Sequence, residues 1–142
     1  MSDSHGLERF VEAQEGVKEA VDRELASGMK RSHWMWFVFP QIQGLGMSMM
    51  AQRYAINSLE EARAYLEHPV LGERLREWTR LVLNVEGKSA KEIFGYPDYL
   101  KFRSCMTLFS QVAGAGSVFH RALDKFYDGE PDQKTLSILG IG

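Results

Sequence analysis

The stretch His33-Trp-Met-Trp-Phe-Val-Phe-Pro-Gln41 is the strongest indication of how this chain folds. From Trp34 to Phe39 every residue is apolar, and four of the six side chains are aromatic. A segment that is apolar on every face must be buried on every face. The run is also too short to cross a bilayer, which takes about 20 apolar residues. We therefore expect it at the centre of the molecule.

The residues that follow this run end it and begin the next element. Pro40 disfavours a helical conformation at the residue before it and so stops any helix there. Gly44-Leu-Gly46 is typical of a loop, and Ser48 is placed to cap a helix. Periodicity leaves two conformations open for the apolar run itself, a short helix and a buried strand.

The composition indicates one globular domain over residues 1–142. Hydrophobic residues make up 44% of the chain and charged residues 25%, which are ordinary values for such a domain. The formal net charge is −2 with the signs interspersed, which argues against nonspecific nucleic-acid binding. The polar N-terminus lacks the apolar core of a signal peptide, so we expect a cytoplasmic protein without membrane association.

Cysteine and histidine usage gives no sign of a metal site. Cys105 is the single cysteine and has no partner for a disulfide, so a buried structural thiol is its expected role. The four histidines show no metal-ligand spacing. We expect neither a metal nor another cofactor.

An amphipathic pattern predicts a long helix before the apolar run. We expect it to run from a cap at Asp3 or Ser4 to about Ala26. Gly16 would lie inside this helix, where a glycine can allow close packing at a cost of about 1 kcal/mol. Gly28 fits the position that ends it.

Further helices are expected where start signals precede apolar stripes. These signals are the capping boxes Ser58–Glu61 and Ser89–Glu92, a first-turn proline at Pro69 and a cap at Asp98. No stretch shows the alternation of a half-buried strand. The sequence therefore predicts an all-α, multihelical single domain of short helices around a buried centre.

Several motifs outside the apolar run carry a resemblance to a known family. They are Gly44-Leu-Gly46 with Ser48, Ala51-Gln-Arg-Tyr-Ala-Ile56, His68-Pro-Val-Leu-Gly72, Lys101-Phe-Arg-Ser104 and Met106-Thr-Leu-Phe109. With the tryptophan-rich block, they resemble a bacterial domain-of-unknown-function family, the one numbered eighteen-ten. The resemblance implies a multihelical domain with a short buried central helix, and no established activity. Some members are labelled calpastatin, but an inhibitor of that kind is disordered, whereas this composition builds a core.

The first candidate site is the loop at Gly44 and Gly46, which leads into the helix start at Ser48. Free backbone N–H groups and the positive end of a helix suit an anion. Arg53 lies close in sequence and can assist. The alternative is that these glycines serve only a tight turn.

Two polar residues flank the apolar run and are further candidates. His33 can act as an acid or base near neutral pH, or it can be a hydrogen-bonded boundary residue. The amide of Gln41 can orient a ligand, or it can tie the loop to a helix end. Trp36 and Tyr54 are expected in the core, with a place in a pocket wall as the alternative.

A polar face on a later helix completes the set of candidates. Lys101, Ser104 and Thr107 are spaced three apart and share one face of a helix. Such a face can contact a phosphate, or it can be an ordinary boundary face. Lys101 and Ser104 also have the residue types of a Ser/Lys nucleophile pair, but no supporting motif accompanies them.

Two functions are compatible with these residues. The first is a domain that binds a small anionic ligand, phosphate- or nucleotide-like, with enzymatic activity left open. The second is a helical protein-interaction module without chemistry, which predicts an exposed apolar patch. Polar residues that folding alone does not require favour the first.

Overall fold

The computed structural model describes residues 5–141, and within them the chain folds into ten helices. They are α1 (Glu8–Glu15), α2 (Lys18–Ser27), α3 (Met35–Val38), α4 (Met49–Arg53), α5 (Leu59–Glu67), α6 (Leu71–Leu83), α7 (Ala90–Phe94), α8 (Asp98–Ala113), α9 (Val118–Tyr127) and α10 (Gln133–Leu139). The β pairing found in this part of the chain is one isolated bridge, between Ile42 and Ile56. The all-α prediction is confirmed.

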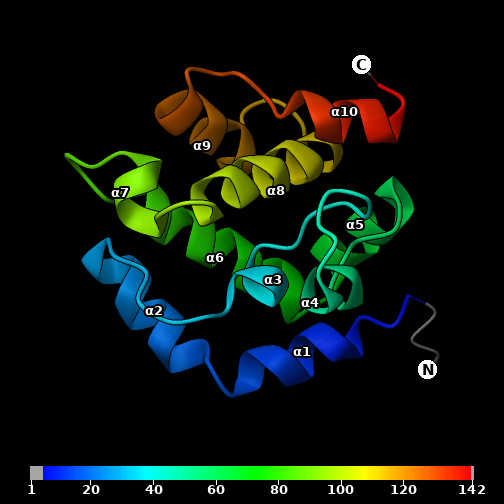
Figure 1. The fold of residues 1–142 in the computed structure, drawn as a ribbon, viewed down its shortest axis with the longest axis horizontal. Helices are drawn as coiled ribbons and strands as arrows, with labels where there is room; N and C mark the ends of the chain where they lie inside the picture. The colour runs from blue at the N-terminus through cyan, green and yellow to red at the C-terminus, as the bar shows by residue number, and fades with distance from the viewer. Residues whose placement is uncertain (1–4, 142) are drawn as a thin grey trace.

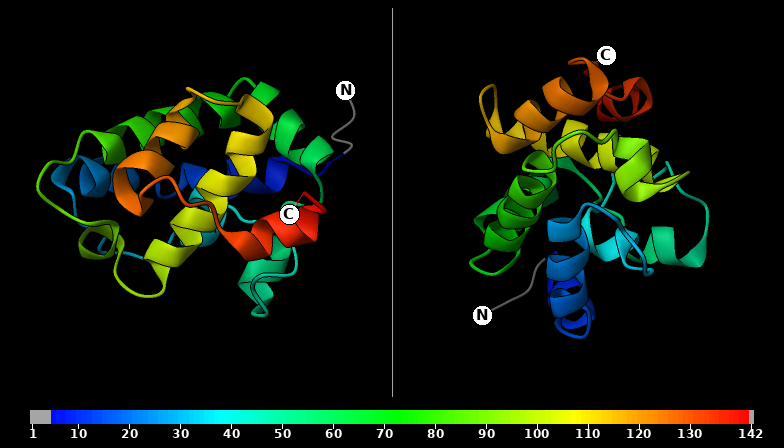
Figure 2. Two further views of the ribbon diagram at one scale, coloured as in Figure 1. Left: turned by 90° about the horizontal axis from the view of Figure 1, so that it is seen from above. Right: turned by 90° about the vertical axis from the view of Figure 1, so that its left-hand side faces the viewer.

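The apolar run forms α3, which lies at the centre of the molecule. In Figure 1, α1 and α2 lie below α3 and α8 lies above it. Figure 2 shows α9 and α10 packed on α8, on the side away from α1 and α2. The short central helix and its end at Phe39, just before Pro40, agree with the sequence.

Aromatic contacts join α3 to the helices around it. The Phe39 ring meets the Phe102 ring at 4.9 Å and the Phe94 ring at 5.9 Å, both edge to face. Each such pair contributes about 0.5–1.5 kcal/mol beyond its buried area. Trp34 is completely buried. Trp36 is the exception, because it is only half-buried, so the expectation that every face of the run is covered is wrong at this residue.

A buried carboxylate fixes the segment that leads into α3. Glu24 of α2 is 6% exposed and accepts hydrogen bonds from the backbone N–H groups of Arg31 and Ser32, from the Ser32 hydroxyl and from Trp34 Nε1. Burial alone raises the pKa of a carboxyl, but these hydrogen bonds outweigh it and lower the pKa of Glu24 to about 2. The tryptophan-rich block is therefore held by polar contacts as well as by packing.

The predicted first helix is two helices in the structure. It breaks at Gly16 and Val17, and an added Cβ at Gly16 would meet nothing within 4 Å, so the expected close packing there is wrong. The glycine weakens a helix at this point, while α1 packs on α3 and α2 packs on α6. Because the two halves pack on different helices, tertiary contacts favour a change of chain direction between α1 and α2. The expected cap at Asp3 or Ser4 lies outside the described residues.

The start signals differ in how the structure uses them. The caps at Ser48 and at Ser58 and the full capping box of Ser89 and Glu92 are present. The Ser58–Glu61 box is only half formed, because the Glu61 carboxylate accepts from Asn57 and pairs with Arg9 at 3.3 Å. The Glu61 carboxylate thus pairs with the Arg9 guanidinium and is not used to cap the start of α5.

Two other start signals act differently from the prediction. Helix α6 begins at Leu71, after Pro69, and the Nδ1 atom of His68 accepts the N–H groups of Val70 and Leu71. Asp98 is the first residue of α8 and does not cap it; its carboxylate pairs with Lys30 at 2.9 Å. Within residues 5–141, no helix is both long and apolar enough to cross a membrane.

Candidate functional site

The loop between α3 and α4 is anchored by its backbone. The N–H of Ile56 donates to the carbonyl of Gln41 at 2.8 Å, and the N–H of Gln43 donates to the carbonyl of Ile56 at 2.8 Å. These two bonds make the bridge of Ile42 and Ile56. The side chain of Gln41 is therefore not needed to tie the loop down.

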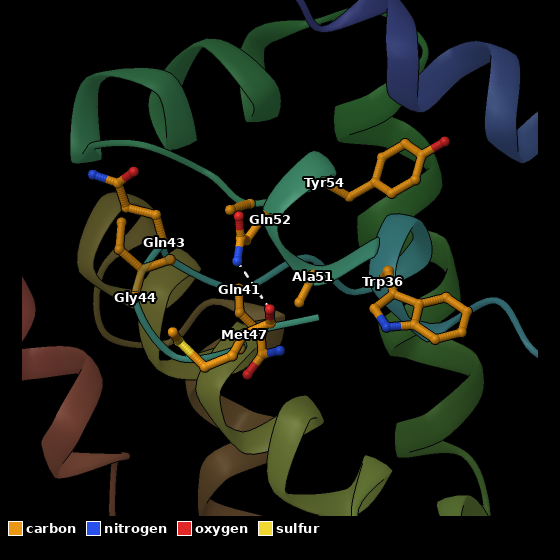
Figure 3. Close-up of a pocket in the computed structure, with 11 residues that line it drawn as sticks. Trp36, Gln41, Gln43, Gly44, Met47, Ala51, Gln52 and Tyr54 are labelled. Atoms are coloured by element: carbon orange, nitrogen blue, oxygen red, sulfur yellow. Dashed lines mark hydrogen bonds between the residues drawn. The ribbon is translucent and has the colours of Figure 1, made fainter. Parts of the chain in front are cut away.

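A hollow of about 410 Å³ lies on one side of this loop (Figure 3). We call it the amide hollow, because three glutamines line it together with one half-buried tryptophan. Its lining residues are Trp36, Gln41, Ile42, Gln43, Gly44, Gly46, Met47, Ala51, Gln52, Tyr54 and Ala55. None of these side chains is charged. In Figure 3 the hydroxyl of Tyr54 points away from the other labelled residues, so Tyr54 contributes little polarity.

A second hollow of about 300 Å³ also borders this loop. We call it the lysine hollow. Its lining residues are Gln41, Leu45, Gly46, Pro97, Leu100, Lys101, Ser104, Asp132 and Lys134. Gln41 and Gly46 belong to both linings, so the two hollows are neighbours. The loop thus contributes a wall that a neutral space and a charged one share.

Gln41 is half-buried in this wall, and its amide has no hydrogen-bond partner among residues 5–141. An amide offers two donor hydrogens and an acceptor oxygen. Gln52 differs, because its Nε2 atom donates to the carbonyl of Met47 at 2.9 Å, as the dashed line in Figure 3 shows. Gln41 is therefore the half-buried amide whose donors and acceptor all remain available to hydrogen-bond a ligand.

The lysine hollow carries a positive balance. The Asp98 carboxylate lies 2.9 Å from the Lys30 ammonium but 3.8 Å from that of Lys101, so Lys30 is its closer partner. The Lys101 ammonium also lies 5.6 Å from the centre of the Trp36 ring, which links the two hollows. Of the residues that line the hollow, Lys101 and the exposed Lys134 are positive and Asp132 is negative, which leaves an excess of one positive charge.

Asp132 serves the fold at the edge of this hollow. Its carboxylate caps α10 by accepting from the backbone and hydroxyl of Thr135, and Ser104 lies 3.1 Å from it. The Ser104 hydroxyl also reaches the carbonyl of Leu100 at 3.2 Å. Because the Lys101 ammonium faces Asp98 and Trp36, the structure does not show a Ser/Lys nucleophile pair.

The other three candidate residues lie outside both hollows. His33 is exposed and lines neither. Arg53 is also exposed; its guanidinium lies 5.6 Å from the centre of the Tyr54 ring, and its carbonyl accepts from Arg9. Thr107 is completely buried, and its hydroxyl accepts the N–H of Asp132 at 2.8 Å. The structure therefore brings together Gln41, Gly44, Gly46, Lys101 and Ser104.

The glycine loop has a packing role beside any ligand role. A Cβ added at Gly46 would lie 2.5 Å from the Cβ of Ala51, so only glycine fits there. Gly44 has a φ of 97°, a conformation that glycine adopts without strain. The Ser48 hydroxyl already accepts the N–H of Ala51 at the start of the short helix α4. An anion at that helix start therefore has less support than one beside the lysines.

Sequence reasoning missed Gln43, Gln52, Asp132 and Lys134 as lining residues. Lys134 lies far along the chain from Gln41, and no local spacing relates the two. Trp36 was considered for a pocket wall, but its apolar neighbours favoured the core. Among residues 5–141, no group of three His, Cys, Asp or Glu side chains can hold a metal ion. Burial raises the pKa of the Cys105 thiol, which suits a structural residue.

Comparisons with known proteins place the chain in a family. No curated protein matches it. The chain is similar to a conserved hypothetical protein, Rv1873 from Mycobacterium tuberculosis, whose crystal structure is solved. The identity is 52%, the TM-score is 0.96, and the match covers 99% of this chain and 100% of that one. Residues 4–139 match the family described as "Protein of unknown function (DUF1810)", so the chain belongs to this family.

Proposed function

We propose that this protein binds a small ligand with an anionic group, such as a phosphate, across the amide hollow and the lysine hollow. The anionic group lies beside Lys101 and Lys134, and the neutral remainder lies in the amide hollow. The observation that carries this proposal is the free amide of Gln41 in the wall that the two hollows share. Pockets of this size are typical of small-molecule sites.

The charge distribution supports this division of the ligand. Lys30 is the closer partner of Asp98, which leaves the charge of Lys101 largely available. An ammonium group binds a phosphate through charge-assisted hydrogen bonds. The amide hollow has no charged side chain that would stabilise an anionic group, so the anionic group binds in the lysine hollow instead. The proposal concerns binding, since Ser104 and Lys101 are not arranged as a nucleophile and its base.

The test measures the binding of inorganic phosphate and ribose 5-phosphate by isothermal titration calorimetry. We expect Lys101→Ala to weaken ribose 5-phosphate binding about 10-fold, which equals the loss of about 1.4 kcal/mol. Lys134→Ala should have a smaller effect, because Lys134 is exposed. Binding should also weaken as ionic strength rises.

Lys91→Ala is the matched control. Lys91 is an exposed lysine of α7 that lines neither hollow, so its loss should leave the affinity unchanged. If neither phosphate compound binds at millimolar concentration, the proposal is wrong. Equal losses in Lys101→Ala and Lys91→Ala would also contradict it, because they would point to nonspecific charge attraction.

A second function, a protein-interaction module, has one observation in its favour. Met47, which lines the amide hollow, is 81% exposed. Met49, two residues further along the chain, is 88% exposed, and Tyr96 is 74% exposed. Exposed methionines are common on binding surfaces. Met49→Lys distinguishes the two functions, since it should abolish a protein contact at these methionines and leave the binding of ribose 5-phosphate intact.

A further inference from the structure

The amide hollow places chemical demands on the neutral part of the ligand. Its polar side chains are the amides of Gln41, Gln43 and Gln52, and its largest ring is that of Trp36. A glutamine amide presents a donor and an acceptor side by side in one plane. A group that pairs with it needs an acceptor and a donor at the same spacing. That arrangement is characteristic of the edge of a nucleobase.

The half-buried Trp36 adds a second demand. Trp34 and Trp78 are completely or almost completely buried and line neither the amide hollow nor the lysine hollow, whereas Trp36 lines the amide hollow. A planar heterocycle gains from contact with an aromatic side chain, by about 1–3 kcal/mol per base where this has been measured. A flat ring with hydrogen-bonding edges satisfies both Trp36 and the amides.

Gln41 is the amide best placed to recognise such an edge. The Nε2 atom of Gln52 is engaged with the carbonyl of Met47, and Gln43 is exposed. Gln41 is half-buried, and its amide has no hydrogen-bond partner in residues 5–141. It also lines the lysine hollow. One ligand can therefore place its base against Gln41 and its phosphate beside Lys101.

We infer that the ligand is a nucleoside monophosphate whose base carries a hydrogen-bond donor next to an acceptor. This inference rests on the proposed function and identifies the neutral part of the same ligand. Gln41 pairs with the edge of the base, Trp36 contacts its ring, and Lys101 meets its phosphate. Gln41 would be the residue that determines specificity.

Three probes separate the contributions to binding. Adenosine 5′-monophosphate carries the full edge, purine riboside 5′-monophosphate has the same ring without the amino group, and ribose 5-phosphate has no base. Calorimetry should give about 10-fold tighter binding for the first than for the second, from the hydrogen-bonded edge. The second should bind about 10-fold more tightly than the third, from the ring contact.

Variants assign these differences to residues. In Gln41→Ala, the affinity for adenosine 5′-monophosphate should fall to the affinity for purine riboside 5′-monophosphate. The affinity for ribose 5-phosphate should be unchanged. Trp36→Leu should reduce the advantage of both nucleotides over ribose 5-phosphate. Gln111→Ala is the matched control, because Gln111 is an exposed glutamine of α8 that lines neither hollow.

The outcomes distinguish this inference from the proposed function. If ribose 5-phosphate binds to the protein and both nucleotides bind with the same affinity as ribose 5-phosphate, the inference is overturned while the proposed function stands. Equal affinities of the two nucleotides in the unaltered protein would overturn recognition of the edge by Gln41. If none of the three probes binds, both the inference and the proposed function are wrong.

Discussion

The residues before and after Pro40 are adjacent in sequence but differ in how their polar groups are used. Before Pro40, Glu24 receives the N–H groups of Arg31 and Ser32 and the indole of Trp34, and the aromatic rings are mostly buried. After it, the amide of Gln41 has no partner in residues 5–141, and the side chain of Met47 is exposed. The polar groups of the first segment therefore stabilise the fold, whereas the second segment has a polar side chain that remains available to a ligand.

The largest expected effect separates two tryptophans that lie two positions apart. Trp34→Ala should cost about 4 kcal/mol of unfolding free energy, because it opens a cavity and removes a hydrogen bond from Glu24. Trp36→Ala should cost roughly half as much, since Trp36 is half-buried. Urea denaturation of the two variants measures the difference. Equal losses would show that both residues serve the core alike.

The Glu24 carboxylate should give the next largest effect, as a function of pH. Its pKa is about 2 in the folded chain against an ordinary value of 4.5, so the unfolded chain takes up the proton first as pH falls. Its stabilisation of about 3 kcal/mol is complete above pH 4.5 and is lost between about pH 4.5 and pH 2. Denaturation curves recorded across this range measure the loss.

Glu24→Gln assigns the acid effect to this residue. The variant keeps an acceptor but cannot take up a proton, so its stability should fall less steeply below pH 4.5. Glu19→Gln, at an exposed position of the same helix, should show the unaltered pH profile. If stability depended on pH identically in the unaltered protein and in both variants, the Glu24 carboxylate would contribute little to stabilising the tryptophan-rich block.

Thr107→Val tests a buried candidate residue with a smaller effect. The change leaves the N–H of Asp132 without its acceptor at 2.8 Å, which should cost about 1–2 kcal/mol. Thr107→Ser keeps the hydroxyl and should lose less. Because Thr107 lines neither hollow, both variants should bind ribose 5-phosphate normally. A selective loss of binding in a stably folded Thr107→Val variant would give this residue a ligand role.

Gln41→Ala should have the smallest effect on stability. Its side chain is without a hydrogen-bond partner in the described part of the chain, and its backbone carbonyl, which anchors the loop, remains in place. We expect a change within about 0.5 kcal/mol in urea denaturation. A loss of 2 kcal/mol or more would show that the amide supports the fold and would remove the contrast across Pro40.

Much of the fold could be predicted from local sequence signals. The all-apolar run required a buried centre, Pro40 ended it, and Ser48 and Ser89 marked helix starts that the structure contains. The single long first helix was wrong, because the competition between helix continuity and packing at Gly16 depends on neighbours far along the chain. Local patterns do not contain that information.

The site was predictable only in part, for a similar reason. Gln41, Gly46 and Lys101 could be selected as polar or conformationally special residues beside core motifs, and they do line the hollows. Lys134 could not, because the packing of α10 on α8 brings it there. The strong polar pairing of Glu24 was also missed, since a glutamate on an amphipathic helix normally faces solvent.

The bridge between Ile42 and Ile56 has a consequence for how this protein can diversify. Both of its hydrogen bonds join backbone atoms, so the anchor does not depend on which side chains the loop carries. Residues between the two anchor points can be exchanged while the base of the loop stays closed, as long as Gly44, Gly46 and the capping Ser48 are kept. Libraries that vary positions 43, 45, 47 and 49 would be a direct route to new ligand preferences on an unchanged helical scaffold.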